Sequence, residues 1–324
     1  MKNILVGLAL LASMLAAPAT IAQQFPSKPL RIVVPAGPGA PPDIVARAMA
    51  EPMGRILGQP VIVENRPGAN MMIGYEYAAK QPADGYTLAL GFPTSLATLP
   101  SLYRELRFDV LKDLPPLIAI ADVSTVFVAS RKRPWKSLNE FAADARANPG
   151  KYNYATSGTA IQLLTEALLQ SLGVKATPIP FGMGTTYQTA LGSGDVDVAV
   201  LGELTAVSMK DRVHVLVASG STRASSFPDV PTVKELGLVD KMGLDMMTQM
   251  TLNAPKGTPK PVLDLLYRAA QQAMEDPKVK ARLEGMGARA PGRPNTPQSN
   301  QQRLEAEAAL LNPLAKRLGI EPMN

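Results

Sequence analysis

The feature that most constrains this fold is a regular alternation of short apolar runs with longer amphipathic stretches. Residues 29–35, 61–64 and 87–91 have the composition and length of buried strands, and residues 43–57 carry apolar side chains at helical spacing. Strands that alternate with helices over such distances predict an α/β layer with a largely parallel sheet.

The same alternation occurs again in the middle of the chain. Residues 126–129, 152–155 and 196–201 predict strands, while residues 138–147 and 162–172 predict helices. Because this second series repeats the first, we expect a second α/β lobe.

The C-terminal part is predicted to be helical. A proline-rich break at residues 255–261 precedes two or three amphipathic helices, the last at about residues 297–318. Because these helices need a sheet to cover, we assign them to the first lobe. The predicted organisation is a signal peptide at residues 1–22, lobe 1 at residues 23–121 and 247–324, and lobe 2 at residues 122–246.

The N-terminus has the pattern of a secretory signal peptide. Lys2 precedes an apolar run at residues 4–15, and small residues follow up to Ala22, where cleavage is expected. The sequence contains no cysteine, which excludes disulfides, thiolate metal sites and a lipid anchor on a cysteine. We therefore expect an exported, periplasmic protein.

The charge pattern argues against nucleic acid as a partner. The net charge of +6 includes Lys2, and the only short basic cluster lies at residues 131–133. Nucleic-acid-binding proteins usually gather such charge in a stripe or patch. A diffuse positive field fits an anionic ligand or partner, and an ordinary solvated surface explains it equally well.

Two loops carry the signs of a binding site. Residues 35–43, P-A-G-P-G-A-P-P-D, follow a strand and open a helix, where backbone N–H groups and the helix dipole favour an anion. Pro42 stands where a dinucleotide-binding fingerprint needs its third glycine. A tight turn that precedes a helix and binds nothing is the alternative explanation for this loop.

Residues 154–160, Y-A-T-S-G-T-A, repeat this arrangement in the second lobe. Two strand-to-helix loops in separate lobes can face each other across a cleft, as is typical of ligand sites in α/β proteins. Taken alone, the second loop is also explained as an ordinary capped helix start.

Signals for catalysis are thin, and we predict no enzyme, no metal and no cofactor. The sequence contains no G-x-S-x-G, H-E-x-x-H or C-x-x-C motif. Its only histidine, His214, lies in a predicted strand, which favours a structural role. Asp195 and Asp197 are expected on one face of a strand, where solvation at a turn explains them.

Several segments together resemble the Bug family, the TctC-type periplasmic receptors of tripartite tricarboxylate transporters. They span nearly the whole mature chain in the family's order: the loop at residues 35–43, E-N-R-P-G-A at 64–69, D-G-Y-T-L at 84–88, A-N-P-G-K at 147–151, P-F at 180–181, G-D-V-D at 194–197, F-P-D-V-P-T at 227–232 and A-P-K-G-T-P-K-P at 254–261.

The resemblance implies a two-lobed periplasmic-binding-protein fold of type II, with two crossing strands and a ligand cleft between the lobes. It also implies a small organic carboxylate as the ligand, held by main-chain groups and water, and the membrane components of a tripartite tricarboxylate-type transporter as partners. We expect a monomer. The ligand-binding residues expected on this basis are Ala36, Gly37, Pro38, Gly39, Ala40, Asp43, Met71, Phe92, Thr94, Thr156, Ser157, Gly158, Thr159, Ala160, Phe181 and Leu201.

The departures from the family pattern all remove polarity from the expected cleft. Where polar or small residues are usual, this chain has Pro42, Asn70, Met71, Ala160, Ile161, Leu163 and Leu201. A buried polar ligand group without a partner there would lose roughly 1–3 kcal/mol. We therefore expect a carboxylate with an apolar or aromatic body. An extracytoplasmic sensor of the same fold and an exported α/β hydrolase are the alternatives.

Overall fold

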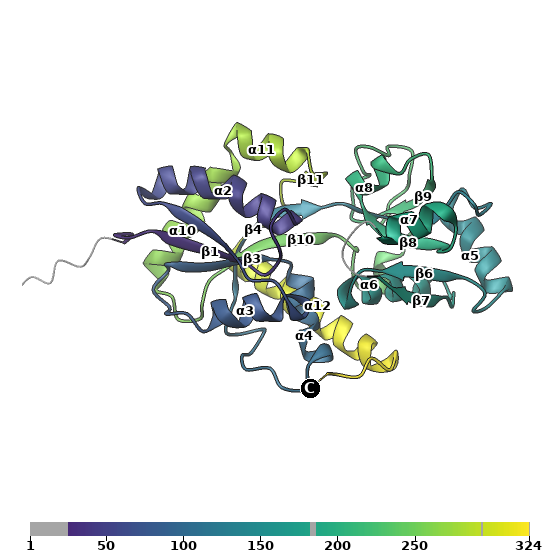
Figure 1. Cartoon of the computed structure of the whole chain (residues 1–324), viewed down its shortest axis with the longest axis horizontal. Helices are drawn as coiled ribbons and strands as arrows, with labels where there is room; N and C mark the ends of the chain where they lie inside the picture. Colours follow the sequence, from purple (N-terminus) through teal and green to yellow (C-terminus); the bar gives the residue numbers. More distant parts are fainter. Residues whose placement is uncertain (1–24, 182–185, 293, 324) are drawn as a thin grey trace, which may run out of the picture.

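A computed structural model describes residues 25–181, 186–292 and 294–323. Figure 1 shows two lobes that lie side by side and are joined through long strands at the centre of the molecule. The expected signal peptide, residues 1–22, lies outside the described residues.

Lobe 1 is built on a six-stranded mixed sheet in the order β11-β4-β10-β3-β1-β2. Its strands are β1 (Leu30–Val34), β2 (Val61–Asn65), β3 (Thr87–Gly91), β4 (Pro116–Val123), β10 (Thr248–Asn253) and β11 (Ala288–Arg289). Its helices are α2 (Pro41–Leu57), the short 3-10 helix η1 (Ala69–Met71), α3 (Met72–Ala79), α4 (Pro93–Leu102), α10 (Lys260–Met274), α11 (Pro277–Glu284) and α12 (Pro297–Arg317).

Lobe 2 is built on a five-stranded mixed sheet in the order β7-β6-β8-β5-β9. Its strands are β5 (Thr125–Ser130), β6 (Asn153–Thr156), β7 (Thr177–Pro180), β8 (Val198–Gly202) and β9 (Val213–Ala218). Its helices are α5 (Leu138–Ala147), α6 (Thr159–Ser171), α7 (Thr186–Ser193), α8 (Glu203–Ser208) and α9 (Val239–Met242).

The expectation of largely parallel sheets holds for only part of each lobe. Strand β1 pairs in parallel with β2 and β3, and β6 does so with β7 and β8. Strand β10 is antiparallel to β3 and β4, and β5 is antiparallel to β8 and β9. The reason is direction: β10 comes back from lobe 2 and β5 enters from lobe 1, so each runs against strands that end at the boundary between the lobes.

The first crossing between the lobes is a single residue long. Strand β4 ends at Val123 in one sheet and β5 begins at Thr125 in the other. On the second crossing, Met246 has a φ of 58° shortly before β10 begins. The Thr125 hydroxyl donates to the Met246 carbonyl over 3.0 Å, so the two crossing segments are tied to each other.

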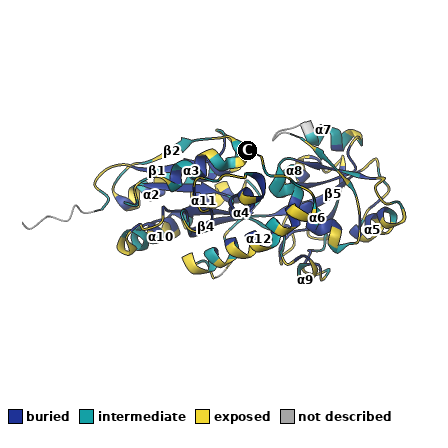
Figure 2. Cartoon of the chain, turned by 90° about the horizontal axis from the view of Figure 1, so that it is seen from below, coloured by how far each residue is buried: buried dark blue, intermediate teal, exposed yellow. Residues whose placement is uncertain are grey.

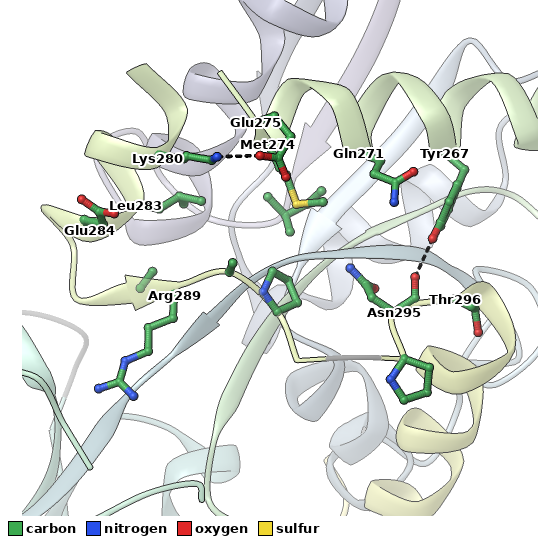
Figure 3. Close-up of a pocket in the computed structure, with 15 residues that line it drawn as sticks. Tyr267, Gln271, Met274, Glu275, Lys280, Leu283, Glu284, Arg289, Asn295 and Thr296 are labelled. Atoms are coloured by element: carbon green, nitrogen blue, oxygen red, sulfur yellow. Dashed lines mark hydrogen bonds and ion pairs between the residues drawn. The ribbon is translucent and has the colours of Figure 1, made fainter. Parts of the chain in front are cut away.

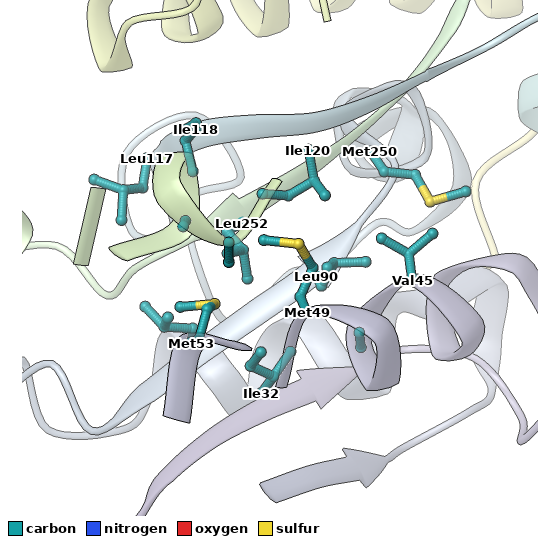
Figure 4. Close-up of a cluster of buried hydrophobic side chains, with 14 of the residues drawn as sticks. Ile32, Val45, Met49, Met53, Leu90, Leu117, Ile118, Ile120, Met250 and Leu252 are labelled. Carbon is teal, nitrogen blue, oxygen red and sulfur yellow. The ribbon is translucent and has the colours of Figure 1, made fainter. Parts of the chain in front are cut away.

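The core of lobe 1 lies between its sheet and helix α2. Figure 4 shows Met49 and Met53 of α2 facing Ile32 of β1 and Leu90 of β3, and all four side chains are buried. Truncating one such side chain typically costs about 2–5 kcal/mol, so this layer fixes the position of α2 on the sheet. Figure 2 shows buried residues along the interior of both lobes.

The C-terminal helix also contacts lobe 2. Leu163 and Ala167 of α6 are buried in one apolar cluster with Leu311, Leu314 and Ala315 of α12. The helix that the sequence assigns to lobe 1 therefore forms part of the boundary between the lobes. Across the described ranges, no helix combines the length and the apolar character that spanning a membrane requires.

Candidate ligand-binding site

The first predicted loop joins β1 to α2 and is organised by a buried side chain. Asp43 is 3% exposed, and its carboxylate accepts the Gly39 N–H over 2.8 Å. Asn65, at the end of β2, donates to the same carboxylate over 2.9 Å and to the Ala36 carbonyl over 3.0 Å. Arg47, one turn further along α2, donates over 3.0 Å. Asp43 thus holds the loop in its shape.

These contacts also settle the charge of Asp43. Burial raises the pKa of this carboxyl, but the hydrogen bonds from Arg47, Gly39 and Asn65 outweigh burial and lower the pKa below its usual value. The group is therefore ionised at neutral pH, and its charge is balanced by Arg47 at 3.0 Å.

The first turn of α2 offers fewer donors than the sequence suggests. The helix begins at Pro41 and not at Asp43, so both of its first positions are prolines without an N–H. The Ala40 N–H is bonded to the Gly37 carbonyl over 3.2 Å. The loop does border free space, because a side chain added at Gly37 or Gly39 would meet nothing within 4 Å.

The second predicted loop joins β6 to α6 and has a different character. Gly158 is the residue before the helix, with a φ of 154°, and no side chain caps the helix start. The first turn contains no acidic residue, and the Thr156 hydroxyl donates to the Gly158 carbonyl over 2.8 Å. A side chain at Gly158 would meet nothing within 4 Å. An uncapped helix start beside open space can accept an anion.

Four other predicted site residues lie just after strands or at the starts of helices. Phe92 precedes α4, and its carbonyl accepts the Tyr75 hydroxyl over 3.0 Å. Thr94 is buried, and its hydroxyl donates to Glu307 of α12 over 2.8 Å. Met71 opens α3 with a φ of 73°, and Phe181 follows β7; both are half-buried.

Leu201 and Leu163 occupy positions that the family resemblance assigned to the cleft. Leu201 is 1% exposed and packs inside an apolar cluster of lobe 2, and Leu163 is fully buried against α12. In this arrangement both side chains serve packing. Ala160 and Ile161, in the first turn of α6, are half-buried and keep exposed surface.

The residues that organise these loops were not predicted from the sequence. Asn65 and Arg47 hold Asp43, and Glu307 holds Thr94. The spacing of Asp43 and Arg47, four apart on one helix, was a signal that could have revealed the first contact. Glu307 follows Arg303 at the same spacing, but nothing local in the sequence connects it to Thr94.

A large cavity lies elsewhere in lobe 1. Its volume is about 860 Å³, and its walls come from α10, α11, β11 and the segment before α12. Figure 3 shows Tyr267, Met274 and Leu283 around it, with Arg289 at one end. None of the predicted ligand-binding residues lines this cavity.

His214, Asp195 and Asp197, which were candidates for catalysis, lie where a structural role explains them. His214 lies in β9, where burial and then the nearby Arg131 lower its pKa. Asp195 and Asp197 lie before β8, which begins at Val198, and not on a strand as expected. Asp197 is buried and accepts the Asn153 N–H over 2.7 Å. The described residues contain no group of three or more metal-ligating side chains placed to hold a metal ion.

Two α/β lobes joined by crossing strands, with a glycine-bearing strand-to-helix loop in each, are the architecture of periplasmic solute-binding proteins. The solved structure of MatC from Rhodopseudomonas palustris with bound malate has a TM-score of 0.73 and 30% identity to this chain, covering 90% of this chain and 100% of MatC. The R. palustris protein Rpa4515 with adipate has a TM-score of 0.76 and 27% identity, covering 92% and 100%.

The sequence narrows this class to one family. Residues 45–318 match the model of the tripartite tricarboxylate transporter family receptor, TctC. Protein BugT of Bordetella pertussis is 33% identical over 297 residues, which cover 87% of this chain and 87% of BugT. The chain belongs to the TctC family, whose members are periplasmic solute-binding receptors and not enzymes. The predicted family and the predicted two-lobed fold are confirmed.

Proposed function

We propose that this protein is exported by a cleavable signal peptide and captures a small organic carboxylate as a monomer. It then delivers the ligand to the membrane components of a tripartite tricarboxylate-type transporter. The observation that carries this proposal is the pair of strand-to-helix loops, one in each lobe, whose glycines border open space. Residues 23–121 with 247–324, and residues 122–246, are proposed as the two bodies that close on the ligand.

The ligand is proposed to have an apolar or aromatic body. The structures of two relatives contain malate and adipate, which are both small dicarboxylates. This chain has three half-buried apolar side chains next to the predicted site: Ile161 in the first turn of α6, Met71 just before α3 and Phe181 just after β7. An ammonium or hydroxyl that faced them would lose hydration without a partner, whereas an alkyl chain or ring would gain about 25 cal/mol per Å² buried.

A thermal-shift screen followed by calorimetric titration tests this proposal. The compounds are malate, citrate, aspartate, adipate and benzoate, added to protein refolded to remove any bound ligand. Adipate or benzoate at 100 times its dissociation constant should raise the free energy of unfolding by about 2.7 kcal/mol. Micromolar binding of aspartate or citrate, without a response to adipate or benzoate, would refute the apolar body. Turnover of a stabilising compound would refute the proposal that this protein is a receptor.

A further inference from the structure

Three neighbouring strands of lobe 1, called the ribbon below, carry a row of paired polar residues one position before the end of β4. In the sheet order β11-β4-β10, Arg289 pairs with Asp122 and Asp122 pairs with Gln249. The Gln249 amide donates to Asp122 over 2.9 Å. One residue after the end of β4, the chain passes into the sheet of lobe 2. This row of polar residues therefore lies beside the crossing.

At the β11 edge of the ribbon formed by β11, β4 and β10, the Arg289 side chain contacts lobe 2. Its guanidinium donates to the Arg223 carbonyl over 2.7 Å. It also lies 3.8 Å from the Glu203 carboxylate, at the start of α8. These contacts join the end of a lobe 1 strand to two segments of lobe 2.

The Glu203 carboxylate depends on that arginine for charge compensation. Glu203 is 1% exposed, and one of its oxygens accepts the Ser226 N–H over 2.8 Å and the Ser225 hydroxyl over 3.0 Å. The other oxygen is buried without a hydrogen-bond partner in the described residues. The Arg289 guanidinium faces this oxygen, and a buried charge is tolerated only when a partner is near.

At the other edge of the ribbon, Arg303 of α12 makes the corresponding contacts. Its guanidinium donates to the Met247 carbonyl over 2.9 Å and lies 3.5 Å from the Asp245 carboxylate. Asp245 belongs to lobe 2, because its carbonyl accepts the Gly220 N–H over 2.7 Å. Arg303 is itself held by Glu307, one turn further along α12, over 3.0 Å.

The segment that Arg303 grips is the strained second crossing. Met246, between the two residues that Arg303 contacts, has a left-handed φ of 58°. Such a conformation of a non-glycine residue persists only where its surroundings enforce it. Here the Thr125 hydroxyl on one side and the Arg303 contacts on the other enclose this residue.

We propose that Arg289 and Arg303 are a pair of clamps, one on each edge of the ribbon, that fix the angle between the two lobes. Each arginine comes from the C-terminal part of lobe 1 and faces a lobe 2 carboxylate. Arg289 also donates to a lobe 2 carbonyl, and Arg303 donates to the carbonyl of Met247, where the chain returns to lobe 1. Breaking a clamp releases the lobes into a second arrangement. The consequence for ligand affinity rests on the proposed function, but the clamps themselves do not.

Lysine is the informative replacement at both positions. It keeps the positive charge opposite Glu203 and Glu307, so no buried carboxylate loses its counter-charge. It lacks the planar fork with which arginine bonds a carbonyl and a carboxylate together. Arg55→Lys is the matched control, because Arg55 bonds Glu51 and Asp276, which both lie in lobe 1.

The test measures the distance between the lobes without any ligand. The chain has no native cysteine, so Lys278→Cys on α11 and Asn139→Cys on α5, both exposed, give one spin label on each lobe. Double electron–electron resonance then reports the distance distribution of the full mature chain. Arg289→Lys and Arg303→Lys should each raise the population of a second distance about tenfold, which corresponds to about 1.4 kcal/mol.

The double variant should raise this population further, and Arg55→Lys should leave the distribution of the parent protein unchanged. If a lysine variant fails to fold, Glu203→Gln and Asp245→Asn break the same clamps from the lobe 2 side. A distribution that stays unchanged in the double variant would overturn the proposal. An effect of one arginine alone would overturn the pairing. A failure to bind carboxylates would leave the distance result standing and would count against the proposed function only.

Discussion

The two strand-to-helix loops of the candidate site share a geometry and differ in what fills it. Each follows a parallel strand, contains a positive-φ glycine and opens a helix: α2 in lobe 1 and α6 in lobe 2. The α2 loop is occupied by its own carboxylate, Asp43, and begins its helix with two prolines. The α6 start has no acidic residue in its first turn and no side-chain cap.

This difference shows that a glycine-bearing loop before a helix is not sufficient for an anion site. The field of a helix N-terminus attracts an anion only when its N–H groups are unspent. In α2 the charge of Asp43 already takes that place. We therefore expect the start of α6 to provide the stronger interaction with a ligand carboxylate. The α2 loop is expected to form a rigid wall of the binding site, with free space beside its glycines.

The largest effect should come from removing the charge that organises the α2 loop. Asp43→Asn weakens the hydrogen bonds from Gly39, Arg47 and Asn65 at once, and it should lower the free energy of unfolding by about 2–3 kcal/mol. Urea unfolding measures the change. Glu51→Gln on the exposed side of the same helix is the control and should cost less than about 0.5 kcal/mol. Equal losses in both variants would mean that the Asp43 network contributes nothing special.

The next effect compares the two loops directly. Gly158→Val and Gly39→Val each place a side chain in space that is open in the structure, and both variants carry the backbone strain of a positive φ. The affinity for adipate should fall at least about tenfold in Gly158→Val and by less in Gly39→Val. Calorimetric titration measures both, after urea unfolding has shown that each variant is folded.

Two results would contradict this comparison. A larger loss in Gly39→Val than in Gly158→Val would reverse the assignment of the stronger anion contact to α6. Unchanged affinity in Gly39→Val would mean that the ligand does not approach the α2 loop.

Acid should remove part of the stability that the α2 loop contributes. Because the pKa of Asp43 is lowered in the folded protein from an ordinary value of 3.8, its ionised form stabilises the fold. This contribution is complete above the ordinary pKa and is lost as the pH falls through the lowered one. The difference in unfolding free energy between the parent protein and Asp43→Asn should therefore be constant at neutral pH and shrink in acid. A difference that does not change with pH would show that Asp43 stabilises through shape alone.

Local patterns in the sequence were enough to predict most strands and helices of both lobes. Strand β3 at residues 87–91 and helix α5 at residues 138–147 have the predicted limits, because each segment has a clear period and clear ends. Helix α4 was not predicted, since residues 93–102 carry two prolines and no amphipathic pattern. Its place is fixed by packing, with Thr94 and Ser101 bonded to Glu307 and Asn312 of α12.

The side-chain directions in the candidate site were harder to predict. Strand β8 is nearly uniformly apolar and buried on both faces, so its sequence does not show which residues point to the cleft. Leu163 is buried by α12, a partner far along the chain. Two of the residues that suggested an apolar pocket therefore serve packing, and the expectation now depends on Ile161 together with Met71 and Phe181.

The smallest effect tests whether the first turn of α6 chooses the body of the ligand as well as its charge. Ile161 is half-buried, three residues after Gly158, so a ligand bound at this helix start would lie close to its side chain. Ile161→Thr removes apolar surface while the backbone N–H groups remain. Each CH₂ that adipate no longer buries costs about 0.8 kcal/mol, so its affinity should fall roughly fourfold, and that of the shorter, hydroxylated malate should change less. Leu172→Thr, at the other end of α6, is the matched control and should leave both affinities unchanged. Titrations that show an equal loss for malate and adipate would mean that Ile161 supports the helix and does not select the ligand.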